Sequence, residues 1–322
     1  MRFSADDLEA ARRTVYAHQP PTPQYDWPLL RERLGMTVWV KHENHTRAGA
    51  FKVRGGLTYF EQLARRQPGL AGVISATRGN HGQSVGYAAR LHGLAATIVV
   101  PHGNSPEKNA AMRALGVELL EHGEDFQASR EHAAQLAQER GLHMIPSFHR
   151  ALVLGVTTYW LEFFSRFARG QEPDVVFVPI GQGSGFCAAA AARAYTGARS
   201  ALVGVVSAHA TTYLDSFRAG RVVAAPVATV LADGMACRVA DEEALEVVLR
   251  EAEDVIAVTD EQVAQAMRVL FHDTHNVAEG AGAAALAAAI QQRGRWAGRS
   301  VGVPLTGGNV DSDAFARVLA AS

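Results

Sequence analysis

Short runs of β-branched and other apolar residues alternate with amphipathic or alanine-rich stretches along most of this 322-residue chain. The apolar runs predict strands at 37–41, 72–75, 96–100, 175–179, 201–206, 254–258 and 300–304. The stretches between them predict helices that include 84–91, 106–115, 129–140 and 261–271, and the alanine-rich stretch 280–290 predicts a closely packed, buried helix. Strands that alternate with helices in this way predict an α/β fold with open, twisted parallel sheets and helices on both faces.

The alternation divides into two parts and predicts a two-lobed molecule. Residues 48–150 contain several complete strand–helix units, enough for a smaller α/β domain with its own core. Residues 1–47 and 151–322 are then expected to form a larger α/β domain that binds the ligand. Ligands of such proteins bind beyond the carboxyl ends of parallel strands and in clefts between lobes, so we expect the site there.

Composition disfavours several classes of function. Hydrophobic residues make up 48% and charged residues 20%, and the formal net charge of −1 gives no reason to expect nucleic acid or an anionic membrane as a partner. The charged N-terminus has no signal core, and no apolar run reaches the length of a membrane span. Cys187 and Cys237 are too few for a disulfide framework or a cysteine-rich metal site. We therefore expect a cytoplasmic protein.

A glycine-rich turn, Gly181-Gln182-Gly183-Ser184-Gly185, directly follows the apolar run 175–180 and precedes a helix of small residues at 186–195. Glycines let backbone N–H groups converge, and the positive end of the next helix favours an anion, so the turn suits a compact phosphate. A plain strand–helix turn is the alternative. An NAD site is disfavoured, because the next strand ends in Ser207-Ala208-His209 without the acidic residue that holds the ribose.

Three further segments carry candidate chemistry. Lys52 lies between two apolar residues just before a predicted helix, a setting that lowers a lysine pKa and suits imine formation with an aldehyde cofactor, although most such lysines are solvated. The segment 77–81 begins a helix whose N–H groups suit a substrate carboxylate, or simply form a cap. Thr306, followed by two glycines after the last strand, suits close contact with a flat ligand.

These four segments, in this order, resemble the threonine and serine dehydratases of the fold-type II pyridoxal-phosphate enzymes, in the tryptophan synthase β-like superfamily. The resemblance runs from Pro21 to about Asn309. It implies pyridoxal 5'-phosphate as the cofactor, held as a Schiff base on Lys52. It also implies a homodimeric carbon–oxygen lyase of amino-acid catabolism, which converts a small β-hydroxy amino acid such as L-threonine or L-serine into a 2-keto acid and ammonia by α,β-elimination.

The resemblance assigns roles to individual residues. Lys52 would be catalytic, Phe51 would lie beside the cofactor ring, Asn80 would bond the ring hydroxyl, and Thr306 would face the pyridine nitrogen, where most relatives have serine. The expected cofactor-binding residues are Phe51, Lys52, Asn80, Gly181, Gln182, Gly183, Ser184, Gly185, Gly234, Glu279 and Thr306. The expected substrate-binding residues are Thr77, Arg78, Gly79, Asn80 and His81.

The chain also departs from the family pattern. Ala50 replaces a serine of the lysine loop, and Arg78 replaces the serine that racemases use as an acid–base group, which disfavours racemisation. Arg78 would instead bind a carboxylate or pair with an acidic residue. Val206 and Thr212 occupy positions where some relatives have acidic ligands for a divalent cation, so no metal is expected. Because the sequence ends at Ser322, no C-terminal regulatory domain is expected either.

Several alternatives remain open. The substrate could be another β-hydroxy amino acid, of the phenylserine or hydroxyaspartate type. A β-replacement enzyme or a threonine synthase would keep the cofactor, although threonine synthases have aspartate where Val53 stands. A non-catalytic binding protein and an NAD-dependent oxidoreductase are weaker alternatives from other classes.

Overall fold

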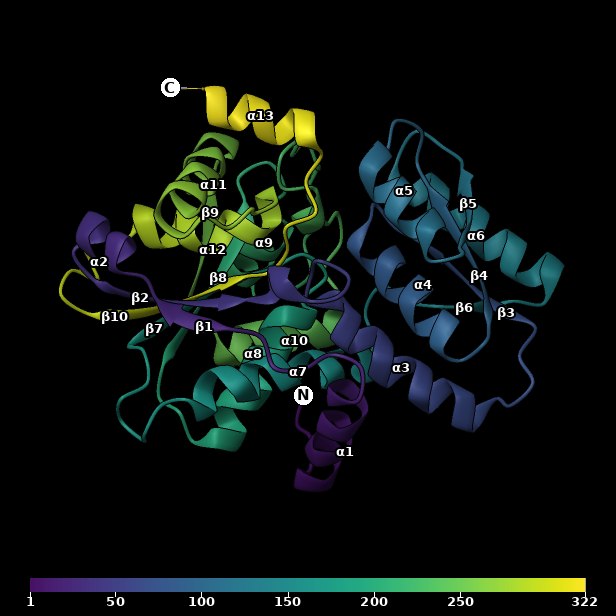
Figure 1. The fold of residues 1–322 in the computed structure, drawn as a ribbon, viewed down its shortest axis with the longest axis horizontal. Coiled ribbons are helices and arrows are strands. Elements are labelled where there is room, and N and C mark those ends of the chain that lie inside the picture. Colours follow the sequence, from purple (N-terminus) through teal and green to yellow (C-terminus); the bar gives the residue numbers. More distant parts are fainter. Residues whose placement is uncertain (322) are drawn as a thin grey trace.

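Two sheets of mainly parallel strands, each flanked by helices, form the body of the molecule in the computed structural model, which describes residues 1–321 (Figure 1). The larger sheet has the strand order β1-β2-β10-β7-β8-β9 and the smaller sheet the order β5-β4-β3-β6. Only β1 pairs antiparallel with its neighbour. The predicted α/β fold with open parallel sheets is confirmed.

The larger sheet consists of β1 (Gln24–Asp26), β2 (Thr37–His42), β7 (Val175–Pro179), β8 (Ala201–Ser207), β9 (Asp254–Val258) and β10 (Ser300–Leu305). The smaller sheet consists of β3 (Gly72–Ala76), β4 (Ala95–Val100), β5 (Glu118–Glu121) and β6 (His143–Met144). All strands of the smaller sheet lie within residues 48–150 and all strands of the larger sheet lie outside them. The domain boundaries themselves stay a prediction.

The helices are α1 (Ala5–Tyr16), α2 (Pro28–Leu34), α3 (Lys52–Arg66), α4 (Asn80–Leu91), α5 (Pro106–Ala114), α6 (Phe126–Arg140), α7 (Arg150–Ser165), α8 (Ser184–Thr196), α9 (Thr212–Ala219), α10 (Glu242–Glu251), α11 (Asp260–Thr274), α12 (Gly280–Gln291) and α13 (Ser312–Ala320). Short 3₁₀ turns lie at η1 (Glu43–His45) and η2 (Asp233–Met235). None of the helices found in residues 1–321 has both the length and the apolar character needed to cross a bilayer.

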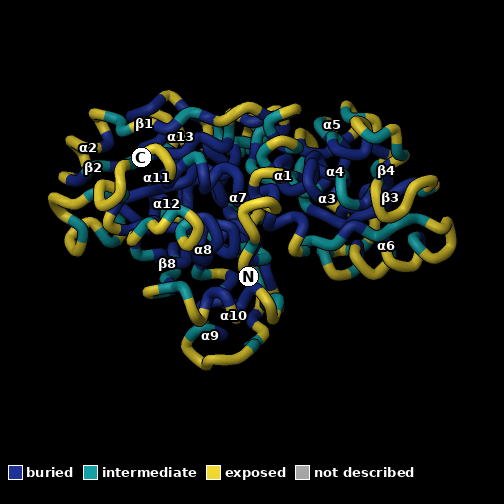
Figure 2. The backbone as a smooth tube through the Cα atoms, turned by 90° about the horizontal axis from the view of Figure 1, so that it is seen from below, coloured by how far each residue is buried: buried dark blue, intermediate teal, exposed yellow. Residues whose placement is uncertain are grey.

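The core of the larger part lies on both faces of its sheet. Along β7, Val176 and Val178 face a cluster built with α7 and α8, while Val175 and Phe177 face a second cluster built with α11 and α12. Alternate side chains of a strand point to opposite faces, so a continuous apolar run is what a strand covered on both sides requires. Figure 2 shows α7, α8 and α12 mostly in the buried colour, and α12 confirms the predicted buried helix.

Helix α7 was not predicted from the sequence. Its residues are buried around nearly the whole circumference, and Tyr159 and Trp160 are fully buried. A helix that is apolar all round has no amphipathic period, and that period is the signal by which helices are read from sequence. The short strands β1, β5 and β6 were missed for a related reason, because two to four residues are too few to show an alternation.

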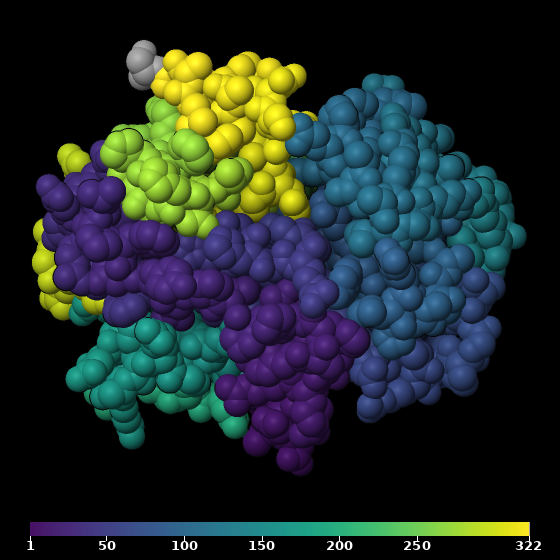
Figure 3. Space-filling model, in the orientation of Figure 1, coloured from purple at the N-terminus to yellow at the C-terminus, as the bar shows by residue number. Residues whose placement is uncertain are grey.

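The two parts of the molecule are in contact side by side (Figure 3). The hydroxyl of Ser105, at the start of α5, donates a hydrogen bond to Asp311, and the N–H of Ser312 donates to Glu107 at 2.8 Å. These bonds join the first turn of α5 in the smaller part to the first turn of α13 in the larger part.

Candidate active site

A cavity of about 490 Å³ lies between the two parts, and every residue predicted to bind cofactor or substrate lines it. The carboxyl ends of three strands meet there: Thr77 follows β3, Gly181 comes two residues after β7, and Thr306 follows β10. This is the edge at which open parallel sheets bind their ligands. The structure thus brings together segments that lie more than 200 residues apart in the chain, such as Asn80 and Asn309.

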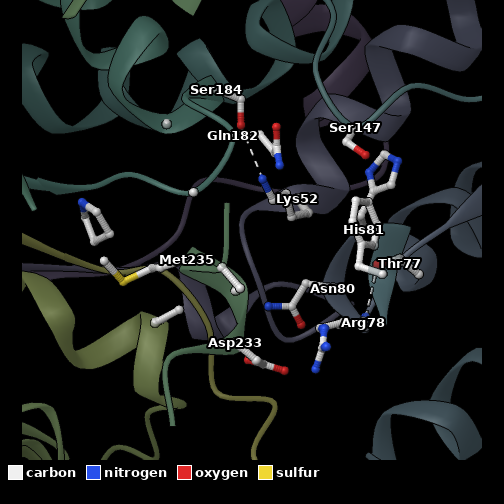
Figure 4. A pocket seen from close by; sticks show the side chains of 18 of the residues that line it. Lys52, Thr77, Arg78, Asn80, His81, Ser147, Gln182, Ser184, Asp233 and Met235 are labelled. Atoms are coloured by element: carbon white, nitrogen blue, oxygen red, sulfur yellow. Dashed lines mark hydrogen bonds between the residues drawn. The ribbon is translucent and has the colours of Figure 1, made fainter. Parts of the chain in front are cut away.

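Lys52 is the first residue of α3, and its side chain enters the cavity (Figure 4). Its Nζ lies 4.6 Å from the centroid of the Phe51 ring and donates a hydrogen bond to Ser184 Oγ at 3.3 Å. Burial lowers the pKa of Lys52 to about 8, against the opposing charge of Glu279. About a tenth of this amine is therefore uncharged, and so nucleophilic, at pH 7, far more than for an ordinary lysine.

The loop before Lys52 is bound to the end of β10. The N–H of Phe51 donates to the Thr306 carbonyl at 3.0 Å, and Ala50 forms a β-bridge with Gly307. Ser84 Oγ, from α4, donates to the Lys52 carbonyl at 2.7 Å. Both parts of the molecule therefore position the lysine.

The glycine turn between β7 and α8 has the form predicted for an anion site. Gly183 has φ +97°, and a Cβ added to it would lie 2.6 Å from the Ala244 Cβ. At Gly181 a Cβ would lie 2.5 Å from the Gly234 carbonyl oxygen. No side chain caps the start of α8, so its first N–H groups are free for a ligand. Trp160, on α7, supports the turn by donating to the Gly185 carbonyl at 3.0 Å.

The segment 77–81 forms the opposite wall. The N–H of Gly79 donates to Thr77 Oγ1 at 3.0 Å, and α4 begins at Asn80 without a side-chain cap. Figure 4 shows the His81 ring on the side of Ser147 and the Arg78 guanidinium on the side of Asn80 and Asp233. His81 Nε2 is buried without a partner, and burial, followed by the charge of Lys52, lowers the pKa of His81 to about 3. This imidazole is therefore neutral.

Arg78 and Thr306 differ in how they are bound. Arg78 makes no hydrogen bond or ion pair with another residue of 1–321, so of the two alternatives left open for it, pairing with an acidic neighbour is absent from that range. The Thr306 hydroxyl donates to the Ala281 carbonyl at 3.3 Å. Its predicted position against a pyridine nitrogen stays a prediction.

Sequence reasoning missed a charged group at the centre of the cavity wall. Lys108, on α5, makes an ion pair with Asp233 at 2.8 Å and with Glu279 at 3.5 Å. In the sequence, Lys108 is one of several polar residues in the first turn of an ordinary amphipathic helix, and nothing distinguishes it. Asp233 begins the segment 233–236, which resembles a family segment that borders the cofactor ring, but its charge was not assigned a role.

A second buried group of charges lies on the other side of α3. Arg54 Nε and Nη2 donate to both oxygens of Glu43 at 2.7 and 2.9 Å, and Nη1 donates to Glu162 at 2.6 Å. Lys41 also binds Glu162, at 2.6 Å. Arg54 and Glu43 are fully buried. This set of two cations and two carboxylates, called the Arg54 cluster below, is closed to the cavity: none of its four members lines it.

The residues present fit a phosphate-bearing aldehyde cofactor. The uncapped start of α8 and its glycines would accept a phosphate, Lys52 is a nucleophilic amine, and His81 Nε2 is a buried polar atom without a hydrogen-bond partner. No group of three or more histidine, cysteine, aspartate or glutamate residues suited to a metal ion was found within 1–321.

Comparison with known proteins gives a consistent picture. The family described as "Pyridoxal-phosphate dependent enzyme" matches residues 15–307. An L-threonine ammonia-lyase of Geobacter sulfurreducens is 35% identical over 87% of this chain and 69% of its own length. An L-threo-3-hydroxyaspartate ammonia-lyase of Saccharomyces cerevisiae is 28% identical over 98% of this chain and 95% of its own. The solved structure of the processed form of threonine deaminase isoform 2 from Solanum lycopersicum superposes with a TM-score of 0.89, at 25% identity, over 100% of this chain and 95% of its own.

Proposed function

Because the chain belongs to the family of pyridoxal-phosphate-dependent enzymes, we propose that it is a dehydratase of the L-threonine and L-serine type. It would convert a β-hydroxy amino acid into a 2-keto acid and ammonia. The observation that carries the proposal is the position of Lys52: a nucleophilic amine, 3.3 Å from Ser184 at the uncapped start of α8, faces a wall of free helix N–H groups. The threonine ammonia-lyase among the relatives supports the reaction class.

Each part of the cofactor has a candidate holder. The glycine turn and the first turn of α8 would bind the phosphate, Lys52 the aldehyde carbon, and Asn80 and Thr306 the edges of the ring. When bound, the cofactor supplies an electron sink that makes the Cα proton of an amino acid acidic.

The chain's own groups supply position and proton transfer. The N–H groups of the first turn of α4, at Asn80 and His81, point their positive end at the cavity and would bind the substrate carboxylate. With the cofactor released from it, the Lys52 amine would be suited to accept the Cα proton, because burial lowers its pKa to about 8. The ammonium so formed would be a proton source for the β-hydroxyl, which would leave as water. The enamine released into solution takes up water and yields the 2-keto acid and ammonia.

Keto-acid release over a panel of β-hydroxy amino acids tests this proposal. L-threonine and L-serine are expected to be turned over, with equal amounts of keto acid and ammonia. Borohydride reduction followed by peptide mapping is expected to place the cofactor on Lys52. The mapping is discriminating because the chain has only two other lysines, Lys41 and Lys108. Turnover that occurs only when sulfide or phosphohomoserine is added would replace elimination by β-replacement or threonine synthesis.

A second candidate, elimination from a β-hydroxy amino acid with an acidic side chain, is favoured by Arg78. This cation lines the cavity without a partner, and five basic side chains against three acidic ones line it in total. The hydroxyaspartate ammonia-lyase among the relatives supports the same substrate class. A second carboxylate on the substrate would give Arg78 the planar, bidentate partner that a guanidinium prefers.

Arg78→Gln separates the two candidates. If Arg78 binds a second carboxylate, kcat/KM for 3-hydroxyaspartate should fall about 10- to 100-fold, the loss expected for a charge-assisted hydrogen bond, while kcat/KM for L-serine changes little. Arg130→Gln is the matched control, since Arg130 also lines the cavity. Equal losses of kcat/KM in both variants would show that the effect comes from the overall positive charge of the cavity and not from a contact with Arg78. No loss for 3-hydroxyaspartate in Arg78→Gln would eliminate this candidate.

A further inference from the structure

Lys108 joins the two parts of the molecule at the wall of the cavity. It extends from α5 to Asp233 and Glu279, which both belong to the larger part, and it is only 7% exposed. Its stem passes beneath the predicted substrate loop: a Cβ at Gly79 would lie 2.5 Å from the Lys108 Cδ. The proposed mechanism gives this cation no task.

A chain of hydrogen bonds determines how the Asn80 amide is turned. Asn309 Nδ2 lies 2.8 Å from the Ala48 carbonyl oxygen, which can only accept, so this atom of Asn309 must be the nitrogen. The same nitrogen lies 2.8 Å from Asn80 Oδ1, which must therefore be the oxygen. Asn80 Nδ2 then donates to Glu279 Oε1 at 2.5 Å. The second N–H of Asn80 has no partner within residues 1–321, and Asn80 lines the cavity.

Glu279 is the second partner that orients the Asn80 amide, beside Asn309, and its ionisation decides how strictly it does so. An ionised carboxylate can only accept and admits one orientation of the Asn80 amide, whereas a protonated one can also donate and admits both. Burial raises the pKa of Glu279 above its ordinary value, and Asp233 adds to this effect, whereas Lys108, the largest opposing influence, and the Asn80 hydrogen bond favour the ionised form. Burial also lowers the pKa of Lys108, but Glu279 and Asp233 outweigh this effect and raise it to about 12. The third charged group facing Glu279 is Lys52.

We propose that Lys108 is a positioning residue, which favours the ionised, acceptor-only form of Glu279 and so, together with Asn309, holds Asn80 as a hydrogen-bond donor toward the ring oxygen of the bound cofactor. A hydrogen-bond donor at that point stabilises the deprotonated form of the ring oxygen. The inference rests on the proposed function for the presence of the cofactor and is independent of which substrate is used.

The absorbance spectrum of the holoenzyme tests this role without any substrate. Bound pyridoxal phosphate absorbs in the visible range when its ring oxygen has lost the proton, and in the near ultraviolet when it has kept it. For the unaltered protein we expect a visible band, because Lys108 favours the ionised form of Glu279. In Lys108→Met, Glu279 loses the cation that favours its ionised form, so its pKa rises further and its protonated form becomes more populated. The ratio of visible to near-ultraviolet absorbance should then fall about five- to tenfold, the effect of weakening a hydrogen bond to a charged group.

Three further measurements separate positioning from general damage. The visible band of Lys108→Met should return as the pH rises, because Glu279 then loses its proton. Lys108→Arg keeps the cation and should keep the spectrum of the unaltered protein. Asn309→Ala removes the other partner that orients Asn80 and should shift the ratio in the same direction without changing any charge. This variant keeps the test available if Lys108→Met does not fold.

The outcomes separate this inference from the proposed function. An unchanged visible band in Lys108→Met or, should that variant not fold, in Asn309→Ala would overturn the role of Lys108 and leave the dehydratase proposal intact. The predicted spectral shifts together with no keto acid from any β-hydroxy amino acid would support the role of Lys108 and refute the dehydratase. An unaltered protein that binds no cofactor would refute both.

Discussion

Helix α3 carries two cations in its first turn, and they have opposite surroundings. Arg54 points into the Arg54 cluster, where each of its three nitrogens binds a carboxylate of Glu43 or Glu162. Lys52 points into the cavity, where a single hydroxyl at 3.3 Å is its hydrogen-bond partner within residues 1–321. One helix thus presents a fully paired charge to the core and an almost unpaired amine to the ligand site.

The difference shows how this fold separates stability from chemistry. Removing charges from water costs several kcal/mol per ion, and the Arg54 cluster offsets that cost by matching two cations with two carboxylates. The cavity wall leaves polar groups without partners, an arrangement that costs stability and that proteins keep where a ligand will complete it. Because both cations lie on one helix turn, the closed cluster holds the start of α3 in place and so positions Lys52.

The largest expected effect comes from the cavity side of α3. Lys52→Ala removes both the cofactor attachment and the proposed base, so keto-acid release should fall by about 10⁴-fold or more. The unfolding midpoint of the cofactor-free protein should change little, because within residues 1–321 the lost amine makes only one hydrogen bond, at 3.3 Å. The rate of keto-acid release, measured with enzyme reconstituted at a saturating cofactor concentration, checks this prediction. Retained turnover with retained bound cofactor would contradict it.

The second-largest effect is expected from the Arg54 cluster, on the other side of α3. Arg54→Met leaves two carboxylates buried with only Lys41 nearby, and the free energy of unfolding should fall by about 3–5 kcal/mol. Urea unfolding of the cofactor-free protein measures it. The double variant Arg54→Met/Glu43→Gln, which removes one charge of each sign, should recover part of the loss. A loss below about 1 kcal/mol would show that the cluster does not stabilise the core.

The third prediction compares glycine substitutions at the two ends of α8. Gly183→Ala places a methyl group 2.6 Å from Ala244 at φ +97°, and we expect a loss of about 2–4 kcal/mol together with weaker cofactor binding. Gly197→Ala, at φ +71° with no atom within 4 Å of the added Cβ, is the control and should lose only about 1 kcal/mol. Cofactor titration of both variants checks the difference. Equal affinities would argue against a phosphate in this turn.

A smaller effect follows from the pKa of Lys52. In protein stripped of cofactor, only the unprotonated amine attaches it, and burial lowers the pKa of Lys52 from 10.5 to about 8. The rate of reloading should therefore rise about tenfold from about pH 7 to about pH 9 and then level off. Stopped-flow absorbance measures it. A rate that keeps rising through about pH 10 would place Lys52 in an ordinary, solvated environment.

The smallest effect belongs to exposed charges. Arg140 and Glu118 form an ion pair at 3.0 Å with side chains 42% and 50% exposed. Arg140→Ala should change the free energy of unfolding by less than about 1 kcal/mol, because water screens such pairs. A loss comparable to that of Arg54→Met would remove the distinction between paired charges in the core and at the surface.

Local patterns were sufficient for much of the site. Phe51 and Lys52, the glycine turn from Gly181, the segment from Thr77 and the end of β10 at Thr306 all lie in motifs that are continuous in sequence, and all line one cavity. Lys108 could not be found in this way. Its partners Asp233 and Glu279 lie 125 and 171 positions further along the chain, and the helix start around it resembles many solvated ones.

By itself, the sequence determined the alternation of strands and helices, the glycines that a tight turn needs and the chemical type of each candidate side chain, because these depend on nearest neighbours along the chain. Only the tertiary structure decided which buried cation is paired and which is free. Lys52 and Arg54 stand two positions apart in one helix. Their different surroundings come from Glu43, Glu162, Ser184 and Glu279, which the fold brings to opposite sides of α3, and electrostatic energy depends on distance through space.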